Sequence, residues 1–310
     1  MIEQLFSNFG FRGLWTPELI VGLMIVAFFY FRLVGKWRTR FVGSEPVKAR
    51  QKVLFVLGLF ALYLGWGSPL YVAGHMMMTF HMLQMVFAYY IAVPLLMMGI
   101  PKWFYRDIVH RLKNKKAVGP VGKILFKPIL ALFIFNGLFS IYHIPLIYDF
   151  LMQTYFLHDL YYFLMLGGAF LMWWHMLAPL PSKDTLPELR RILYIFLNGV
   201  LITPACASII FSSSALYGVY TDPVIWAKTM AYCLPPGADV PYQLFGGGVN
   251  QFSPLTPKGD QQLAGILMKI LQEFSFSILI GYVFRQWVKK EKQSDGPSIS
   301  DIPETMVIKN

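Results

Sequence analysis

The chain is poor in charge. Only 14% of its 310 residues are Asp, Glu, Lys or Arg, whereas a soluble domain carries about 25%. Several uncharged runs are longer than the roughly 18 residues that suggest a helix able to cross a bilayer. This composition excludes an ordinary soluble globular protein. It predicts an all-α polytopic membrane protein whose helical bundle is a single domain.

Cysteine is scarce as well. The two that are present, Cys206 and Cys233, form neither a CxxC pair nor the spacing of a zinc site. A disulfide-rich secreted scaffold and a structural zinc module are therefore excluded. The two thiols could form one disulfide if both face an oxidising compartment, and the sequence leaves this open.

Acidic residues are fewer than basic ones, and the net charge is +11. An excess of this size would suit a nucleic-acid-binding protein, but the Lys and Arg residues cluster in short segments between apolar runs. In that position they set membrane topology and meet anionic lipid head groups. We therefore expect membrane lipid as a partner and no nucleic acid.

Seven apolar segments are long enough to be spans, and most of the 27 basic residues follow the first, third, fifth and seventh of them. The positive-inside rule then predicts an N-terminus outside the membrane and a C-terminus in the cytoplasm. The long loop would lie outside, with a short helix near 222–230. The expected parts are an external lead-in 1–15, a bundle 16–288 that includes the external loop 212–260, and a cytoplasmic tail 289–310. Within the bundle the expected spans are 16–33, 53–70, 74–101, 124–143, 154–177, 191–211 and 263–288.

The third segment, 74–101, combines His and Met in its first half. Met78, His81, Met82 and Met85 are three or four residues apart, so they share one face of a helix. Imidazole and thioether are ligands that suit copper, Cu(I) in particular. Methionine is also a common filler of irregular core space, but polar side chains at membrane depth are costly and usually functional.

The expected topology gathers the His residues near the outer ends of the spans. His75 and His81 belong to the outer part of the third span, while His143 ends the fourth and His158 begins the fifth. A carboxylate beside a ligating His commonly orients its second ring nitrogen. Asp159 and Asp260 are candidates for that role, and the alternative for each is capping of a helix N-terminus. Within the seventh span, Lys269 and Glu273 are expected to pair.

Four blocks of the sequence resemble the seven-span CtaG family, whose members are assembly factors for bacterial caa-type haem–copper cytochrome c oxidases. The blocks are SPLYVAGHMMMTFHMLQMVFAYYIAVPLLMMGIP (68–101), YHIPLIYDF (142–150), HDLYYFLMLGGAFLMWWHML (158–177) and DQQLAGILM (260–268). The resemblance implies a multi-pass protein of the bacterial plasma membrane that helps to mature the oxidase, with copper delivery as the expected chemistry.

The resemblance also points to particular residues. His81 and Gln84 match the family's H-M-x-Q motif, and His143 and His158 match the His residues at the end of the fourth span and the start of the fifth. Many relatives have a second His after the Gln, where this chain has Met85. They also have an acid and a His on the fifth span, where this chain has Tyr161 and Tyr162, so a rich His site on that span is not expected.

Three hypotheses follow. The first is a non-enzymatic copper-handling factor that passes the ion to oxidase subunits, with metal ligands from His81, Met85, Met78, His143, His158 and His75 and supporting contacts from Gln84, Asp159 and Asp260. The second is a metal-free scaffold for oxidase subunits. The third is an intramembrane zinc hydrolase, because three His and a water could complete a catalytic zinc site.

Overall fold

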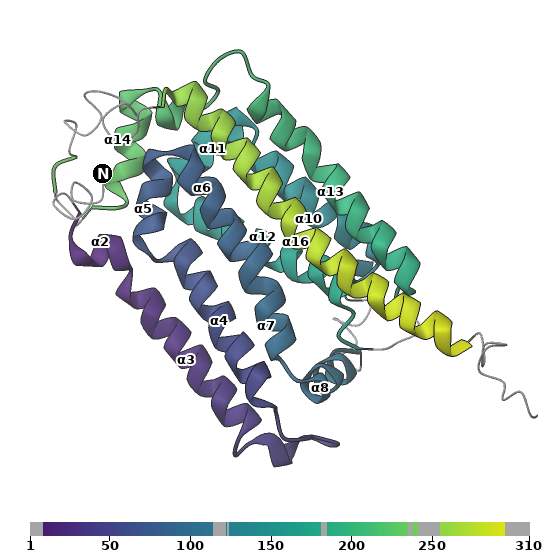
Figure 1. Ribbon diagram of the computed structural model, residues 1–310. Helices are drawn as coiled ribbons and strands as arrows, with labels where there is room; N and C mark the ends of the chain where they lie inside the picture. Colours follow the sequence, from purple (N-terminus) through teal and green to yellow (C-terminus); the bar gives the residue numbers. More distant parts are fainter. Residues whose placement is uncertain are drawn as a thin grey trace, which may run out of the picture.

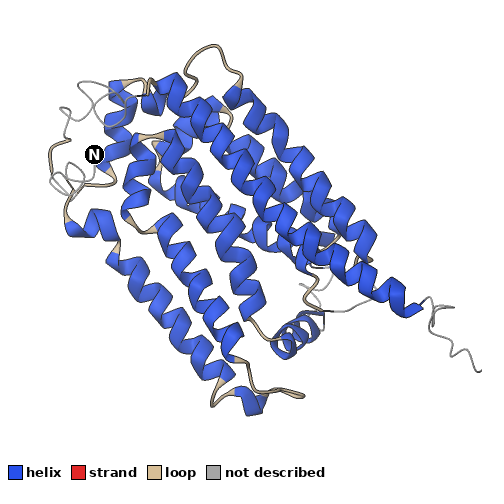
Figure 2. Cartoon of the chain, in the orientation of Figure 1, coloured by secondary structure: helices blue, strands red, loops and turns tan. Residues whose placement is uncertain are grey.

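The computed structural model describes residues 9–113, 122, 124–180, 185–234, 238–240 and 255–294. Every regular element in this part of the chain is helical (Figure 2), which confirms the all-α prediction for the described residues. Residues 1–8 of the expected lead-in, most of the loop between 235 and 254, and the expected tail from 295 onward lie outside them.

Proline sets the start of many helices. It holds the first position of α3, α5, α10, α11, α14 and α16, where its missing N–H would be unpaired in any case. The helices, drawn in Figure 1, are α2 (Phe11–Trp15), α3 (Pro17–Val34), α4 (Ala49–Trp66), α5 (Pro69–Met76), α6 (Met78–Met85), α7 (Val93–Gly99), α8 (Lys102–Lys113), α10 (Pro128–Tyr142), α11 (Pro145–Met152), α12 (Tyr155–Leu177), α13 (Glu188–Ile210), α14 (Pro223–Ala231) and α16 (Pro257–Ser294), with 3₁₀ turns η1 (Arg38–Arg40) and η3 (Gly218–Tyr220) and the π-helical segment η2 (Val86–Ala92).

Six helical stretches of the described chain are long and apolar enough to cross a membrane: Phe11–Val34, Ala49–Met76, Met78–Gly99, Tyr155–Leu177, Glu188–Ile210 and Pro257–Gln293. A seventh is reached if α10 and α11, which meet at a bend of 78°, count as one span. The chain is thus a multi-pass membrane protein. The segment between the expected spans 124–143 and 154–177, for which no helix was expected, forms the helix α11.

The third span begins later than expected. Met77 has an extended backbone (φ −143°, ψ 134°) and separates α5 from α6. His75 therefore lies on α5, which continues the second span, while His81 lies on α6. The predicted single helix from 74 is wrong at this point. Further along, η2 precedes Pro94, whose missing N–H cannot bond the carbonyl four residues earlier.

The α6–η2–α7 stretch is the most buried of the candidate spans, and α3 is the least buried. On α3, Phe28 and Phe29 face outward, while Tyr30 stacks on Phe55 of α4 with ring centroids 3.7 Å apart. Exposed aromatic side chains along a long apolar helix are the expected surface toward lipid. The outer position of α3 in Figure 1 agrees with this arrangement.

Short elements close one end of the bundle. α11, η3 and α14 gather there around the α5–α6 junction, whereas α8 lies at the opposite end (Figure 1). α14 confirms the short helix expected near 222–230, and the Asp222 carboxylate caps it by accepting from Val224 N and Ile225 N. The expected pair on α16 is also confirmed, because Lys269 Nζ donates to Glu273 Oε1 at 2.5 Å.

Candidate functional site

The α5–α6 junction is held by a residue that lies far along the chain. Asp260, in the first turn of α16, accepts from Met78 N at 2.7 Å and from Thr79 N at 3.3 Å. The Thr79 hydroxyl donates back to the Asp260 carbonyl at 3.1 Å. The buried carboxylate thus caps α6, a helix other than its own. Asp260 does not cap α16, which begins at Pro257, and its expected support of a His ring stays a prediction.

His81 and His143 form the first His pair. His81 lies on α6 and His143 ends α10, and their ring centroids are 5.8 Å apart in an edge-on arrangement. The Nδ1–H of His143 donates to the Phe139 carbonyl at 2.8 Å. In a neutral imidazole the other nitrogen then carries a lone pair. His81 is 1% exposed and His143 3%, and the Nε2 atoms of both are buried without a hydrogen-bond partner.

Tyrosine rings enclose this pair. Tyr142 stacks on His81 at 5.7 Å and Tyr148 meets it edge-on at 5.1 Å. Tyr148 donates to the Tyr220 hydroxyl at 2.6 Å, since that hydroxyl itself donates to the Gly74 carbonyl at 2.8 Å. The η3 turn is thereby fastened over the rings. These tyrosines were not predicted as site residues, although Tyr142 directly precedes His143 in the sequence.

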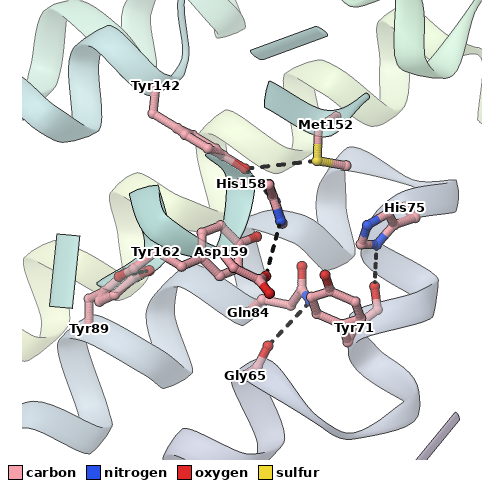
Figure 3. A network of polar contacts seen from close by, with 10 residues as sticks. All are labelled: Gly65, Tyr71, His75, Gln84, Tyr89, Tyr142, Met152, His158, Asp159 and Tyr162. Atoms are coloured by element: carbon pink, nitrogen blue, oxygen red, sulfur yellow. Dashed lines mark hydrogen bonds and ion pairs between the residues drawn. The ribbon is translucent and has the colours of Figure 1, made fainter. Parts of the chain in front are cut away.

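His75 and His158 form the second His pair, with ring centroids 6.0 Å apart. His75 makes the same kind of hydrogen bond as His143. Its Nδ1–H donates to the carbonyl of Tyr71, four residues earlier, at 2.9 Å. The Nδ1 of His158 lies 3.8 Å from Asp159 Oδ1 (Figure 3). The expected neighbourhood of Asp159 and His158 is therefore present, at ion-pair distance and without a hydrogen bond.

Tyr142 joins the two His pairs. Its ring packs on His81, and its hydroxyl lies 3.1 Å from His158 Nε2 and 3.9 Å from Met152 Sδ (Figure 3). The four His rings thus lie in two pairs with a tyrosine between them. Sequence patterns could not show this, because Tyr142 and Met152 come from opposite sides of the bend between α10 and α11.

Gln84 lies beside the first pair. Its Nε2 donates to the Gly65 carbonyl at 3.2 Å, while its Oε1 is buried without a partner. A side chain at Gly74 would collide with the Gln84 amide and meet the Cα of His81 at 3.2 Å. Gly74 therefore permits the close approach of α5 to α6, and with it the position of Gln84.

The predicted thioether ligands are buried nearby. Met78, Met82 and Met85 belong to the main core cluster, and the thioether with a polar contact at the site is that of Met152. In the part of the chain that the structure describes, no group of three or more His, Cys, Asp and Glu side chains could hold a metal ion. Metal binding by the six predicted ligands stays a prediction.

The two cysteines are not joined. Both thiols are free and buried, Cys206 on α13 and Cys233 just after α14. Burial raises the pKa of the Cys233 thiol to about 12, so it is a thiol at neutral pH and a poor metal ligand. Neither cysteine adds a ligand to the His pairs.

One comparison with known proteins identifies a family. A family model described as cytochrome c oxidase caa3 assembly factor (Caa3_CtaG) matches residues 28–290. This range includes both His pairs, Gln84, Asp159 and Asp260. No curated protein and no solved structure matches the chain.

Proposed function

The chain belongs to the cytochrome c oxidase caa3 assembly factor (Caa3_CtaG) family, and from this premise we propose that it binds copper and delivers it to the oxidase. Copper is cargo in this proposal, and the protein catalyses no reaction. The ion would first meet the His pairs at the capped end of the bundle and then pass to an oxidase subunit docked alongside.

One observation carries the proposal: the Nε2 atoms of His81 and His143 are both buried and both without a partner. A buried acceptor without a partner is costly in a stable fold. A soft cation would satisfy both nitrogens at once, and bonds of about 2 Å would place them about 4 Å apart. Ring centroids at 5.8 Å are compatible with that spacing.

The surrounding residues suit a site that releases its ion. Gln84 ties α6 to the Gly65 carbonyl of α4 and so helps to fix the position of His81, and Met78 or Met85 would supply a soft, weak third ligand. His75 and His158 form a second binding position for the ion, beside the partly exposed carboxylate of Asp159. Tyr142 contacts both pairs, so its side chain lies between the two positions. Few and soft ligands favour transfer over storage.

The capped end lies on the outer side of the plasma membrane in this proposal. The opposite end carries α8 with its Lys and Arg residues, and the positive-inside rule places such segments in the cytoplasm. Single cysteines introduced at Val42 and at Ser213, in a variant that lacks Cys206 and Cys233, test it. An impermeant thiol reagent on intact cells should label the second position only.

Copper binding is tested with the purified chain. A competition titration of Cu(I) against a chelator should show that His81→Ala combined with His143→Ala lowers the affinity at least about 100-fold, or about 2.7 kcal/mol. The matched control is His110→Ala on α8, at the opposite end, which should bind as the wild type does. Cells that carry the double variant should contain oxidase deficient in copper.

The same titration separates the alternatives. A metal-free scaffold predicts equal copper affinity in all variants and normal oxidase in cells that carry the double variant. A zinc hydrolase predicts that zinc is preferred to copper and that a lipid amide or ester is cleaved. Either result would overturn the copper proposal.

A further inference from the structure

The end of the bundle far from the His pairs contains a buried arginine that donates no hydrogen bond to an acid among the described residues. Arg191 is 7% exposed, although it lies in the second turn of α13. Its Nη2 donates to the amide oxygen of Gln286 on α16 at 2.6 Å, and its Nε is buried without a partner. Among the ion pairs of the described residues none includes Arg191.

A neutral amide does not compensate a buried positive charge. A guanidinium taken out of water is tolerated when an anion accepts its hydrogen bonds, and it is costly otherwise. The nearest acid along the helix, Glu188, faces Lys290 at 3.4 Å. Glu188 also lies close enough to act on the Arg191 charge, but it accepts no hydrogen bond from the guanidinium. An anion that accepts from Arg191 would therefore come from outside the described chain.

Two more polar atoms without partners belong to Tyr194 and His175, whose rings pack against each other at the same end of the bundle. Tyr194 is one turn further along α13, on the same face as Arg191. Its hydroxyl is buried and unpartnered, as is Nε2 of His175 on α12. The rings of Tyr194 and His175 meet edge-on with centroids 5.7 Å apart. The hydroxyl can donate, and an imidazole nitrogen can donate or accept.

The local field also favours an anion. The site lies near the N-terminus of α13, which carries the positive end of the helix dipole. Arg190 is exposed directly beside it, and Lys289 and Lys290 follow on α16. At this depth, near the end of a spanning helix, the anions at hand are the phosphate groups of lipid head groups.

We propose that Arg191, Tyr194 and His175 form a binding site for a phosphate group, and that the phosphate belongs to an anionic phospholipid. Arginine suits this task because its planar fork can donate two parallel hydrogen bonds to a phosphate. The inference is independent of the copper proposal, since it uses other residues at the opposite end of the bundle.

The test measures the thermal unfolding of the delipidated full chain in neutral detergent. Phosphatidylglycerol should stabilise the wild type, and phosphatidylcholine and inorganic phosphate should do so weakly. Arg191→Gln should weaken the response to phosphatidylglycerol by about tenfold or more in half-saturating concentration. The exposed neighbour supplies the matched control, and Arg190→Gln should respond as the wild type does.

Two milder variants keep the test informative if Arg191→Gln fails to fold. Arg191→Lys keeps the charge and loses the fork, so it should bind with intermediate affinity. Tyr194→Phe removes a single hydroxyl and should weaken the response several-fold. Native mass spectrometry should find fewer retained phosphatidylglycerol molecules on Arg191→Gln than on Arg190→Gln.

Equal stabilisation of the wild type, Arg191→Gln and Tyr194→Phe by phosphatidylglycerol would overturn the site. If inorganic phosphate alone stabilises the wild type, and Arg191→Gln abolishes that effect, the phosphate site stands and the lipid as its source is overturned. Neither result depends on whether copper binds at the His pairs.

Discussion

The two ends of the bundle differ in the kind of polar atom that they leave without a partner. At the capped end, His81 and His143 present buried ring nitrogens whose lone pair can accept a hydrogen bond or be donated to a metal ion. At the other end, Nε2 of His175 is also without a partner, but Arg191 adds a positive charge and a buried N–H that can only donate. Tyrosine rings enclose the His pair, whereas Arg191 lies near the start of α13. The difference in charge predicts a cation at one end and an anion at the other.

The largest expected effect is a double dissociation between the ends. His81→Ala with His143→Ala should lower Cu(I) affinity at least about 100-fold and leave stabilisation by phosphatidylglycerol intact. Arg191→Gln should do the reverse. Each variant is measured in both assays, by chelator competition and by thermal unfolding. A variant that loses both responses would mean that the two ends do not act separately.

The next largest effect is expected from Asp260, whose carboxylate caps α6 at the end of the bundle that carries the His pairs. Asp260→Ala removes the carboxylate that accepts from two backbone N–H groups of α6 and leaves the buried Met78 N–H unpaired. The cost should be about 3 kcal/mol of unfolding free energy. Asp222→Ala removes an exposed local cap of α14 and should cost about 1 kcal/mol.

Denaturant titration in mixed micelles measures both changes. Equal losses for the two aspartates would contradict the cap across helices. A normal unfolding free energy for Asp260→Ala, together with lost copper affinity, would indicate that Asp260 acts by supporting a His ring and not by capping α6.

A smaller effect is expected at Gly74. Gly74→Ala would push a methyl group into the Gln84 amide, which should cost about 2 kcal/mol of unfolding free energy and weaken copper binding. Gly137 on α10 has open space where its Cβ would lie. Gly137→Ala should therefore change the stability by about 1 kcal/mol or less, and in the stabilising direction. The same titration compares them, and equal destabilisation would refute the close approach at Gly74.

The smallest effect tests the link between the two His pairs. Tyr142→Phe removes the hydroxyl 3.1 Å from His158 Nε2 and should weaken copper binding about fivefold, or about 1 kcal/mol. Tyr161→Phe also removes a hydroxyl, one that donates to the Leu138 carbonyl at 2.8 Å, and should leave copper affinity unchanged. Chelator competition distinguishes them, and identical affinities would remove Tyr142 from the site.

The sequence predicted the parts of the fold that depend on local composition. Apolar length located the spans, and Lys269 with Glu273 followed from a spacing of four. The break at Met77 was not predictable in this way, because the cap on α6 comes from Asp260, 182 positions away in the chain. His75 was consequently placed on the wrong helix.

The sequence predicted which His residues gather at this end of the bundle. It did not predict the tyrosine rings that enclose them. The gathering of four His at one end of the bundle followed from the order of the spans. Their division into two pairs depends on the bend between α10 and α11, which brings Tyr148 and Met152 back toward Tyr142. No local pattern encodes a contact of that kind. Gln84 was found through the family motif, whereas its dependence on Gly74 needed the packed helices.

X-ray absorption of the Cu(I)-loaded chain shows directly whether the His81–His143 pair holds copper. The expected spectrum has imidazole scattering from two rings and at most one sulfur, and His81→Ala should lose this signature. A coordination shell dominated by sulfur, or a spectrum that is the same in the wild type and in His81→Ala, would contradict copper binding by this pair.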